Sequence, residues 1–313
     1  MDQRFFTLQK EKKSMKNWVF VIGVLAVSLI ACDDFSYVGK ANDVPTAGRV
    51  KVGFDHGDSM MVVQWLEMFH AKYPQASIIP VFKETDELVE HWMKDSIQGV
   101  FLHKKFSQEE LNWLEDKKNA TINEVPMGTT SVVFITNPNS KINSIDFYSG
   151  QTNWNEVTHW IIRSKNMKGF RLLKKDTLLS NIAKKALFNK RIKETSSDVN
   201  TINSVLKEPN SLGIISLNTI ADKRDSLSVA LKRKVKVVPV IANKEAQYPF
   251  QSQIAAKQYP YTLPLISYES QGYSGLIKGL VIYTNSQAGQ ALLQKSGLIP
   301  ANYQGRKIQV KVD

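Results

Sequence analysis

The chain of 313 residues has one cysteine, Cys32, and only five histidines. A single cysteine cannot form a disulfide within the chain. In an exported protein, the remaining possibilities are a modified thiol and a disulfide to another molecule. The histidines lack the paired spacing of a metal site. The sequence also lacks a Ser-His-Asp order, a cluster of paired carboxylates and a glycine-rich phosphate loop, so it gives no positive sign of an enzyme or a cofactor.

Cys32 follows a long apolar run, residues 18–31, which is preceded by a basic segment with Lys10, Lys12, Lys13 and Lys16. A transmembrane helix needs about 20 apolar residues, so a shorter run behind lysines is typical of an export signal. The alternative is an uncleaved membrane helix with a buried thiol at its end. The tripeptide Leu29-Ile30-Ala31 resembles the bacterial lipobox, in which a small residue precedes a cysteine that is lipidated and becomes the new N-terminus.

By that resemblance, residues 1–31 are a lipoprotein signal peptide and Cys32 is the lipid anchor. Several acyl chains on one residue anchor a protein stably to its membrane. Residues 32–48 are polar and small and show neither helical nor alternating periodicity, so we predict a linker. The protein is therefore expected in the cell envelope, on a bacterial membrane and facing away from the cytoplasm.

The formal charge is +12, and because residues 1–31 carry +3, about +9 remains after the signal. Such a surface is either solvated near anionic lipid or polysaccharide, or it includes a basic site that attracts an anionic ligand. No segment with helical periodicity concentrates Arg and Lys between aromatic residues. Nucleic acid is therefore not an expected partner.

From residue 49 on, segments typical of strands and helices alternate, which indicates an α/β protein with a parallel or mixed sheet and helices on its faces. Thr85 is the expected N-cap of a helix at 85–94, and Ser107 with Glu110 forms a capping box. The expected strands of this first block are 49–54, 76–82, 98–102 and 130–136, and the other expected helix is 61–73.

A second α/β block begins near residue 145 and ends with an expected strand at 234–241. A third block has an expected strand at 263–268, helices at 273–285 and 287–295, and a closing strand at 307–312. Three blocks in the order A, B, A′ predict two lobes that the chain crosses twice. Residues 49–136 and 245–313 would form the first lobe, and residues 137–244 the second.

Three segments resemble the phosphate-type periplasmic solute-binding proteins of ABC importers. Residues 147–156, FYSGQTNWNE, are similar to the family pattern F-x-G-x-x-x-x-W-x-E/D. Residues 259–265, YPYTLPL, resemble its Y-P-L-x-R strand, and residues 288–301 resemble its last helix and G-L-x-P ending. Each pattern alone is common, but the three occur in the family order and cover most of the chain. The resemblance implies a two-lobe periplasmic-binding-protein-like fold of type II, which closes over a ligand.

Such clefts hold a small anion with hydroxyls, N–H groups at helix N-termini and an arginine. Ser59 begins the first expected helix region and is either its N-cap or a ligand contact. The family arginine falls on Lys104, which keeps the charge but loses the planar geometry. The family aspartate, which can accept a hydrogen bond from a protonated phosphate oxygen, falls on Thr130, which is uncharged.

The helix-start motif of the second lobe falls on Thr177, with Ser180 and Asn181 in its place if the alignment slips by one or two residues. His56 and His103 fall on loops that should face the same cleft, where Asp55 or Asp58 would have to complete a metal site. Ordinary surface histidines are the alternative that we adopt, so we predict no metal.

The resemblance therefore implies a lipid-anchored solute-binding protein that captures a small anion, phosphate first, and delivers it to an ABC permease. Because several groups of the phosphate site are replaced, the alternative is an envelope lipoprotein that uses the scaffold as a binding or assembly module without transport. An enzyme ranks third.

Overall fold

The computed structural model describes residues 43–149, 154, 157–179, 181, 184 and 192–302. The predicted signal peptide, Cys32, Ser180 and the predicted strand at 307–312 lie outside these residues. Within the described part, no helix combines the length and the apolar character needed to cross a membrane.

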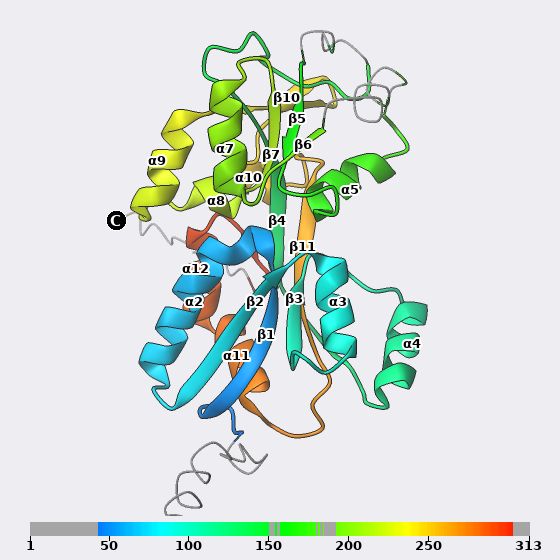
Figure 1. Ribbon diagram of the computed structural model, residues 1–313, viewed down its shortest axis with the longest axis vertical. Helices are drawn as coiled ribbons and strands as arrows, with labels where there is room; N and C mark the ends of the chain where they lie inside the picture. The colour runs from blue at the N-terminus through cyan, green and yellow to red at the C-terminus, as the bar shows by residue number, and fades with distance from the viewer. Residues whose placement is uncertain are drawn as a thin grey trace, which may run out of the picture. The chain divides into compact units, whose positions relative to one another are not determined.

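The first of two lobes contains a mixed sheet with the strand order β2-β1-β3-β11-β4 (Figure 1). Strand β1 pairs in parallel with β2 and β3, whereas β11 is antiparallel to β3 and β4. The short strand β12 pairs with β4. The bounds of these strands are Gly48–Asp55 (β1), Ala76–Lys83 (β2), Gly99–Leu102 (β3), Thr262–Glu269 (β11), Asn123–Thr136 (β4) and Ile299–Pro300 (β12).

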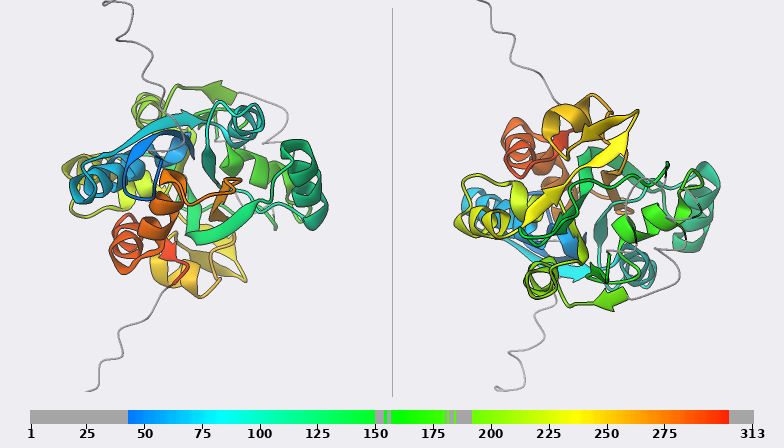
Figure 2. Two further views of the ribbon diagram at one scale, coloured as in Figure 1. Left: turned by 90° about the horizontal axis from the view of Figure 1, so that it is seen from below. Right: turned by 90° about the horizontal axis from the view of Figure 1, so that it is seen from above.

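Helices cover both faces of this sheet (Figure 2). On one face lie α2 (Ser59–Lys72), α11 (Leu276–Asn285) and α12 (Gln287–Lys295), and on the other lie α3 (Thr85–Met93) and α4 (Gln108–Lys118). The buried side chains of β1 include Val50, Val52 and Phe54, which alternate along the strand. The ring of Phe54 stacks on that of Phe101 of β3, with centroids 5.0 Å apart, so period-two burial fixes the register of the sheet.

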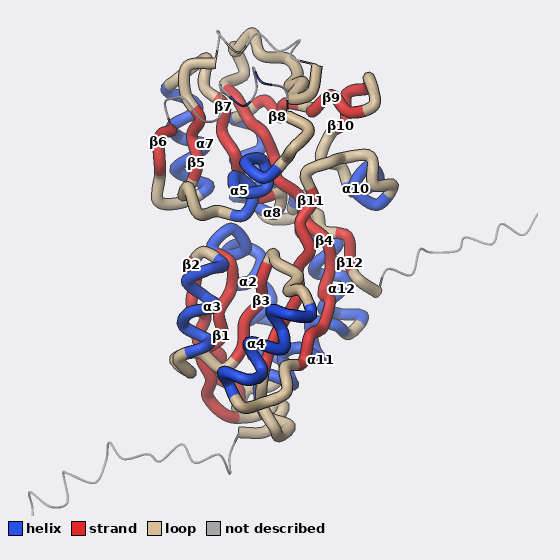
Figure 3. Tube along the Cα trace, turned by 90° about the vertical axis from the view of Figure 1, so that its right-hand side faces the viewer, coloured by secondary structure: helices blue, strands red, loops and turns tan. Residues whose placement is uncertain are grey.

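Strand β4 belongs to both lobes. Its first part pairs with β11, and its residues from Val132 onward pair with β7 and β8. Figure 3 shows β4 and β11 running from one lobe to the other. The chain therefore crosses into the second lobe along β4 and returns on the way into β11.

In the second lobe, β7 pairs with β4 and in parallel with β5, which pairs with β6. The described helices between β4 and β11 are α5 (Lys168–Lys175), α7 (Asp198–Lys207), α8 (Asn218–Ala221), α9 (Ser226–Lys234) and α10 (Gln251–Ala255). The described strands between β4 and β11 are β5 (Trp160–Ile162), β6 (Ile192–Glu194), β7 (Leu212–Ser216), β8 (Lys236–Val238), β9 (Val240–Ala242) and β10 (Glu245–Gln247). The last two form a hairpin, whose turn residues Asn243 and Lys244 have positive φ.

The prediction of a mixed α/β fold with two lobes is confirmed, whereas the residue boundaries of the lobes stay a prediction. The capping box of Ser107 and Glu110 is present at the start of α4. The expected strand at 234–241 is instead two strands, β8 and β9, separated at Pro239, because proline cannot donate a ladder hydrogen bond.

Two expected helix caps differ from the structure. The N-cap of α3 is Glu84, because the Thr85 hydroxyl donates to Asp55 Oδ2 over 3.1 Å. The N-cap of α2 is Asp58, so Ser59 is its first helical residue. Both differences lie near the ends of strands β1 and β2. There, side chains bond to neighbouring elements and do not cap their own helix.

Asp43, in the last part of the predicted linker, caps α11. Its Oδ1 accepts from the N–H of Leu276 over 2.7 Å, and its Oδ2 accepts from the Tyr273 hydroxyl over 2.7 Å. The carboxylate thus satisfies a free N–H in the first turn of α11 and complements the helix dipole. Asp43 therefore ties the chain before the first strand to the first lobe.

Candidate ligand site between the two lobes

Arg163 directly follows β5, and its buried side chain joins the two lobes. Its Nε donates to Glu84 Oε1 over 2.9 Å, and its Nη1 donates to Asp198 Oδ1 over 2.8 Å. Its Nη2 reaches Asp55 Oδ1 at 3.3 Å. Asp55 ends β1 and Glu84 follows β2 in the first lobe, whereas Asp198 begins α7 in the second. We call these four residues the Arg163 cluster.

The charges of the Arg163 cluster shift the pKa values of its members. Burial disfavours the charge on Arg163, but the three carboxylates outweigh this effect and raise the pKa of the guanidinium. Burial raises the pKa of Glu84, and the attraction of Arg163 offsets only part of that increase. Three carboxylates around one guanidinium leave a formal excess of negative charge.

A second buried ion pair lies next to the Arg163 cluster. His103, which follows β3, places Nε2 2.8 Å from Asp58 Oδ2 and Nδ1 3.0 Å from the carbonyl oxygen of Pro264. Asp58 Oδ1 also accepts from Asn218 Nδ2 of α8 over 2.6 Å, so this pair too reaches the second lobe. Burial lowers the pKa of His103, but the charge and hydrogen bond of Asp58 outweigh it and raise that pKa to about 9. His103 is therefore an imidazolium at neutral pH.

A small cavity lies between the Arg163 cluster, the middle of β4 and the end of β7. The space open to the centre of a water molecule is about 10 Å³, which is room for about one water. Thr130 and Ser131 of β4 line it, and both hydroxyls are buried without a hydrogen-bond partner among the described residues. Buried hydroxyls without partners are uncommon in proteins, so a hydroxyl that points into the cavity can bond a molecule there.

The N-terminus of α5 also faces this cavity. Lys168 and Gly169, its first two residues, line the cavity, and the N-cap residue Met167 makes no side-chain cap. A Cβ atom at Gly169 would lie 2.9 Å from Cγ2 of Val132, so glycine allows the helix to approach β4 this closely. The uncapped first turn gives the cavity wall N–H donors and the positive end of a helix dipole.

The two lobes also touch at Gly57, in the short helix η2 (His56–Asp58). A Cβ atom at this position would overlap the hydroxyl of Ser216 and lie 3.0 Å from Nη1 of Arg163. Only glycine fits here with the lobes in this arrangement. The cavity is therefore closed by direct contact between the lobes as well as by the ion pairs.

Among the residues that the sequence predicts for the site, Thr130 lines the cavity. Lys104 instead pairs with Glu110 at 2.6 Å and lies 4.6 Å from the ring centroid of Phe106. Ser59 is half-buried at the start of α2, and Thr177 and Asn181 are exposed. None of these four is part of the cavity wall that the described residues form.

The sequence-based prediction missed the Arg163 cluster. Its signal is a charged residue at the end of a strand or directly after it: Asp55 ends β1, Glu84 follows β2 and Arg163 follows β5. In α/β sheets the carboxyl ends of neighbouring parallel strands meet at the ligand crevice, so such charges converge. Within the described part of the chain, no group of three or more His, Cys, Asp or Glu side chains is arranged to hold a metal ion.

The chain belongs to the PBP superfamily, because the model of the PBP superfamily domain matches residues 41–290. No curated protein sequence matches the chain. Among solved structures, it is similar to a putative phosphate ABC transporter substrate-binding protein with bound phosphate from Clostridium perfringens. That match has 17% identity and a TM-score of 0.62, and it covers 81% of this chain and 100% of the other.

Two further structures share the fold. An ABC-type phosphate transport receptor from Vibrio cholerae matches with 14% identity and a TM-score of 0.56 over 81% of this chain and 100% of its own. An OxyR protein from Corynebacterium glutamicum matches with 10% identity and a TM-score of 0.53 over 88% of this chain and 74% of its own. At these identities the likeness concerns the fold alone.

Proposed function

We propose that the protein is a lipid-anchored solute-binding protein that captures a small oxyanion, phosphate first, between its lobes and delivers it to an ABC permease outside the cytoplasm. The observation that carries this proposal is the convergence of oxyanion donors on one buried cavity. Arg163, Thr130, Ser131 and the first two residues of α5 all line it. The phosphate-related proteins that share the fold support the choice of ligand.

The carboxylate of Asp55 favours an oxyanion that carries a proton. It lines the cavity and would repel a fully ionised anion, but it can accept a hydrogen bond from a P–OH group. Phosphate keeps at least one proton at neutral pH, whereas sulfate keeps none. Asp55 would thus serve the role that Thr130 cannot, and we expect phosphate to bind in preference to sulfate.

Binding requires the lobes to separate first, because the cavity has room for about one water. The open form would take the anion on one lobe, and contacts from the other lobe would then favour the closed form. The ion pairs of Arg163 oppose opening, so the free protein is expected to populate the closed form substantially. This population lowers the apparent affinity for any ligand that enters only the open form.

Isothermal titration of the full-length protein in a mild neutral detergent tests this proposal. At low ionic strength, phosphate should release heat and sulfate should not. Arg163→Met should abolish the heat, whereas Arg233→Met, at an exposed position of α9, should leave it unchanged. Absence of both heat and thermal stabilisation with millimolar phosphate would refute the proposed ligand.

One observation favours a second function, that of an envelope module without transport. The three nitrogens of Arg163 are all directed to carboxylates of the protein, so the lobes are held together without an anion. In that case phosphate gives no heat, and the gene lies apart from permease and ATPase genes. A neighbouring permease gene together with phosphate heat would exclude this function.

A further inference from the structure

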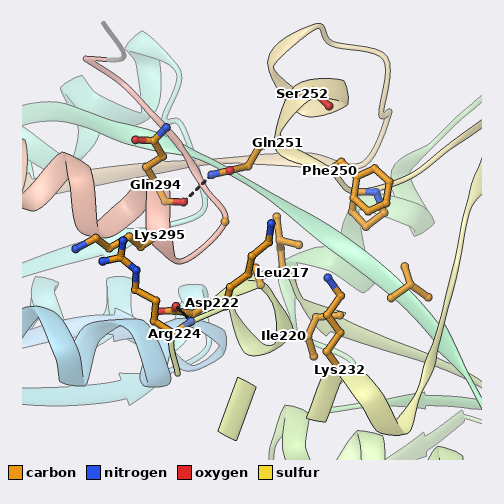
Figure 4. A pocket seen from close by; sticks show the side chains of 15 residues that line it. Leu217, Ile220, Asp222, Arg224, Lys232, Phe250, Gln251, Ser252, Gln294 and Lys295 are labelled. Carbon is orange, nitrogen blue, oxygen red and sulfur yellow. Dashed lines mark hydrogen bonds between the residues drawn. The ribbon is translucent and has the colours of Figure 1, made fainter. Parts of the chain in front are cut away.

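A second and larger cavity, of about 460 Å³, lies apart from the Arg163 cluster (Figure 4). Its walls come from α8 and the loop after it, from α9, from α10 and from the end of α12. None of its lining residues belongs to the small cavity between the lobes. Its volume is in the range of pockets that bind small organic molecules, about 300 to 1,000 Å³.

The lining of this cavity is strongly basic. Lys223, Arg224, Lys232 and Lys295 contribute four cationic side chains, and none of them forms an ion pair within the described part of the chain. Asp222 is the acidic residue of the described lining, and its Oδ1 accepts from the backbone N–H of Arg224 over 2.8 Å. The lining therefore has a formal excess of three positive charges, which favours an anionic occupant.

The cations are spread around the cavity and not gathered on one side. In Figure 4, Arg224 and Lys295 occupy one side, and Lys232 and Phe250 occupy the other. Arg224 comes from the loop after α8, whereas Lys295 ends α12. Like charges brought together from separate elements repel one another, and a bound anion would relieve that repulsion.

The same cavity has an apolar part. In Figure 4, Leu217 lies between the two sides and Ile220 lies next to Lys232, and Phe250 exposes 53% of its surface. The Phe250 ring stacks on Tyr248 with centroids 5.2 Å apart, so it is held in place although it is exposed. A large exposed aromatic ring on a cavity wall gains free energy when it is covered by an apolar group.

A glutamine holds the walls of the cavity together. Gln251 Nε2 donates to the carbonyl oxygens of Gln294 over 2.7 Å and Leu298 over 2.9 Å, which ties α10 to the end of α12. These bonds fix one wall before any ligand arrives. A preformed cavity loses less conformational freedom when it binds.

We propose that this cavity binds an amphiphilic organic anion. The carboxylate or phosphate head pairs with Arg224 and Lys295 on one side, and the aliphatic or aromatic body packs on Leu217, Ile220 and Phe250 toward the other side. A free metabolite and the headgroup region of an anionic lipid both have this chemistry. The inference does not depend on phosphate binding between the lobes.

Titration with 1-naphthyl phosphate tests the proposal on the full-length protein in nanodiscs of neutral phosphatidylcholine. We expect saturable binding that neutral 1-naphthyl glucoside does not reproduce. Arg224→Glu with Lys295→Glu should weaken binding by roughly 100-fold, and Phe250→Ala by about tenfold, if each lost contact has the energy of a typical charged or apolar contact. Arg233→Glu, next to Lys232 on α9 but outside the lining, should change it less than about twofold.

Two further measurements make the test decisive. Thermal unfolding of each variant checks that it is folded, and Thr130→Val should leave naphthyl phosphate binding unchanged because Thr130 lies in the other cavity. Weaker binding in phosphatidylglycerol nanodiscs than in phosphatidylcholine nanodiscs identifies a lipid headgroup as the competing occupant, and equal binding identifies a free anion. No saturable binding, or equal loss in the paired variant and in Arg233→Glu, would overturn the proposal.

Discussion

Nε of Arg163 lies 2.9 Å from Oε1 of Glu84, and this bond joins the end of a strand in one lobe to the end of a strand in the other. Both side chains are buried. The bond is part of a cluster in which one guanidinium serves three carboxylates, so loss of the guanidinium leaves several charges unpaired at once.

Arg163→Leu should therefore destabilise the protein strongly. Removing one partner of a buried ion pair costs about 3 to 5 kcal/mol, because the remaining charge stays buried without compensation. Urea denaturation followed by circular dichroism measures the change in the free energy of unfolding. Arg171→Leu is the control, since Arg171 pairs with Asp86 at a partly exposed site, where a pair contributes about 1 kcal/mol or less. Equal losses in the two variants would contradict this account.

The His103–Asp58 pair should make stability depend on alkaline pH. The pKa of His103, about 9, exceeds the value near 6.5 of an unfolded histidine. The stabilisation is therefore complete below about pH 6.5 and is lost as the pH rises through about 9. The shift corresponds to about 3 kcal/mol as an order of magnitude. Denaturation midpoints between pH 6 and 10 should fall for the wild type and fall less for His103→Gln. His91→Gln, at a site near the surface, should follow the wild type.

Thr130→Val should lower the affinity for phosphate without lowering the stability of the protein. The Thr130 hydroxyl is buried without a partner, so its removal should leave the free energy of unfolding unchanged or raise it by about 1 kcal/mol. Phosphate affinity should nevertheless fall roughly tenfold, because one hydrogen bond to a charged ligand is lost. Calorimetric titration and urea denaturation give the two quantities. Thr129→Val, at the neighbouring position outside the cavity wall, should change the phosphate affinity and the free energy of unfolding by less. A Thr130→Val protein that binds phosphate like the wild type would exclude this hydroxyl from the site.

Gly57→Ala should prevent full closure of the lobes. The added methyl group would overlap the Ser216 hydroxyl across the lobe contact, so the closed form is expected to lose free energy relative to the open form. Small-angle scattering should then give a larger radius of gyration for the variant. Gly272→Ala is a matched control, because a Cβ atom there meets nothing within 4 Å. An unchanged radius in Gly57→Ala would show that the contact yields locally.

Cys32→Ser should remove the proposed lipid anchor. Cells that express the wild-type protein and are grown with labelled palmitate should incorporate label into it, and the variant should carry none. The wild type should sediment with membranes, whereas the variant should not be attached through acyl chains. Label that persists in the variant would place the modification elsewhere.

Much of the fold could be predicted from the sequence, because it depends on patterns within short segments. Strand β1 shows its alternation, and Ser107 with Glu110 marks the start of α4. The cap at Thr85 was predicted wrongly, since its hydroxyl bonds to a residue 30 positions earlier. Capping preferences predict a side chain that bonds to its own helix. They fail where the side chain bonds to a neighbouring strand.

The site was harder to predict for the same reason. Arg163 and Asp55 are 108 positions apart in the chain, and only the pairing of strands brings them together. The family resemblance predicts that Lys104 contacts the ligand, but Lys104 instead forms an ion pair with nearby Glu110. Thr130, which the family resemblance predicts for the site, lines the small cavity, and its role in binding stays a prediction.

The 14 residues of β4 have a consequence for how the protein unfolds. Because one continuous strand supplies hydrogen bonds to both sheets, neither lobe can melt without exposing an edge of the other. Calorimetric melting should thus show a single cooperative transition, and the amide protons in the middle of β4 should be the last to exchange with deuterium. The strand joins the two lobes into one unit that unfolds together.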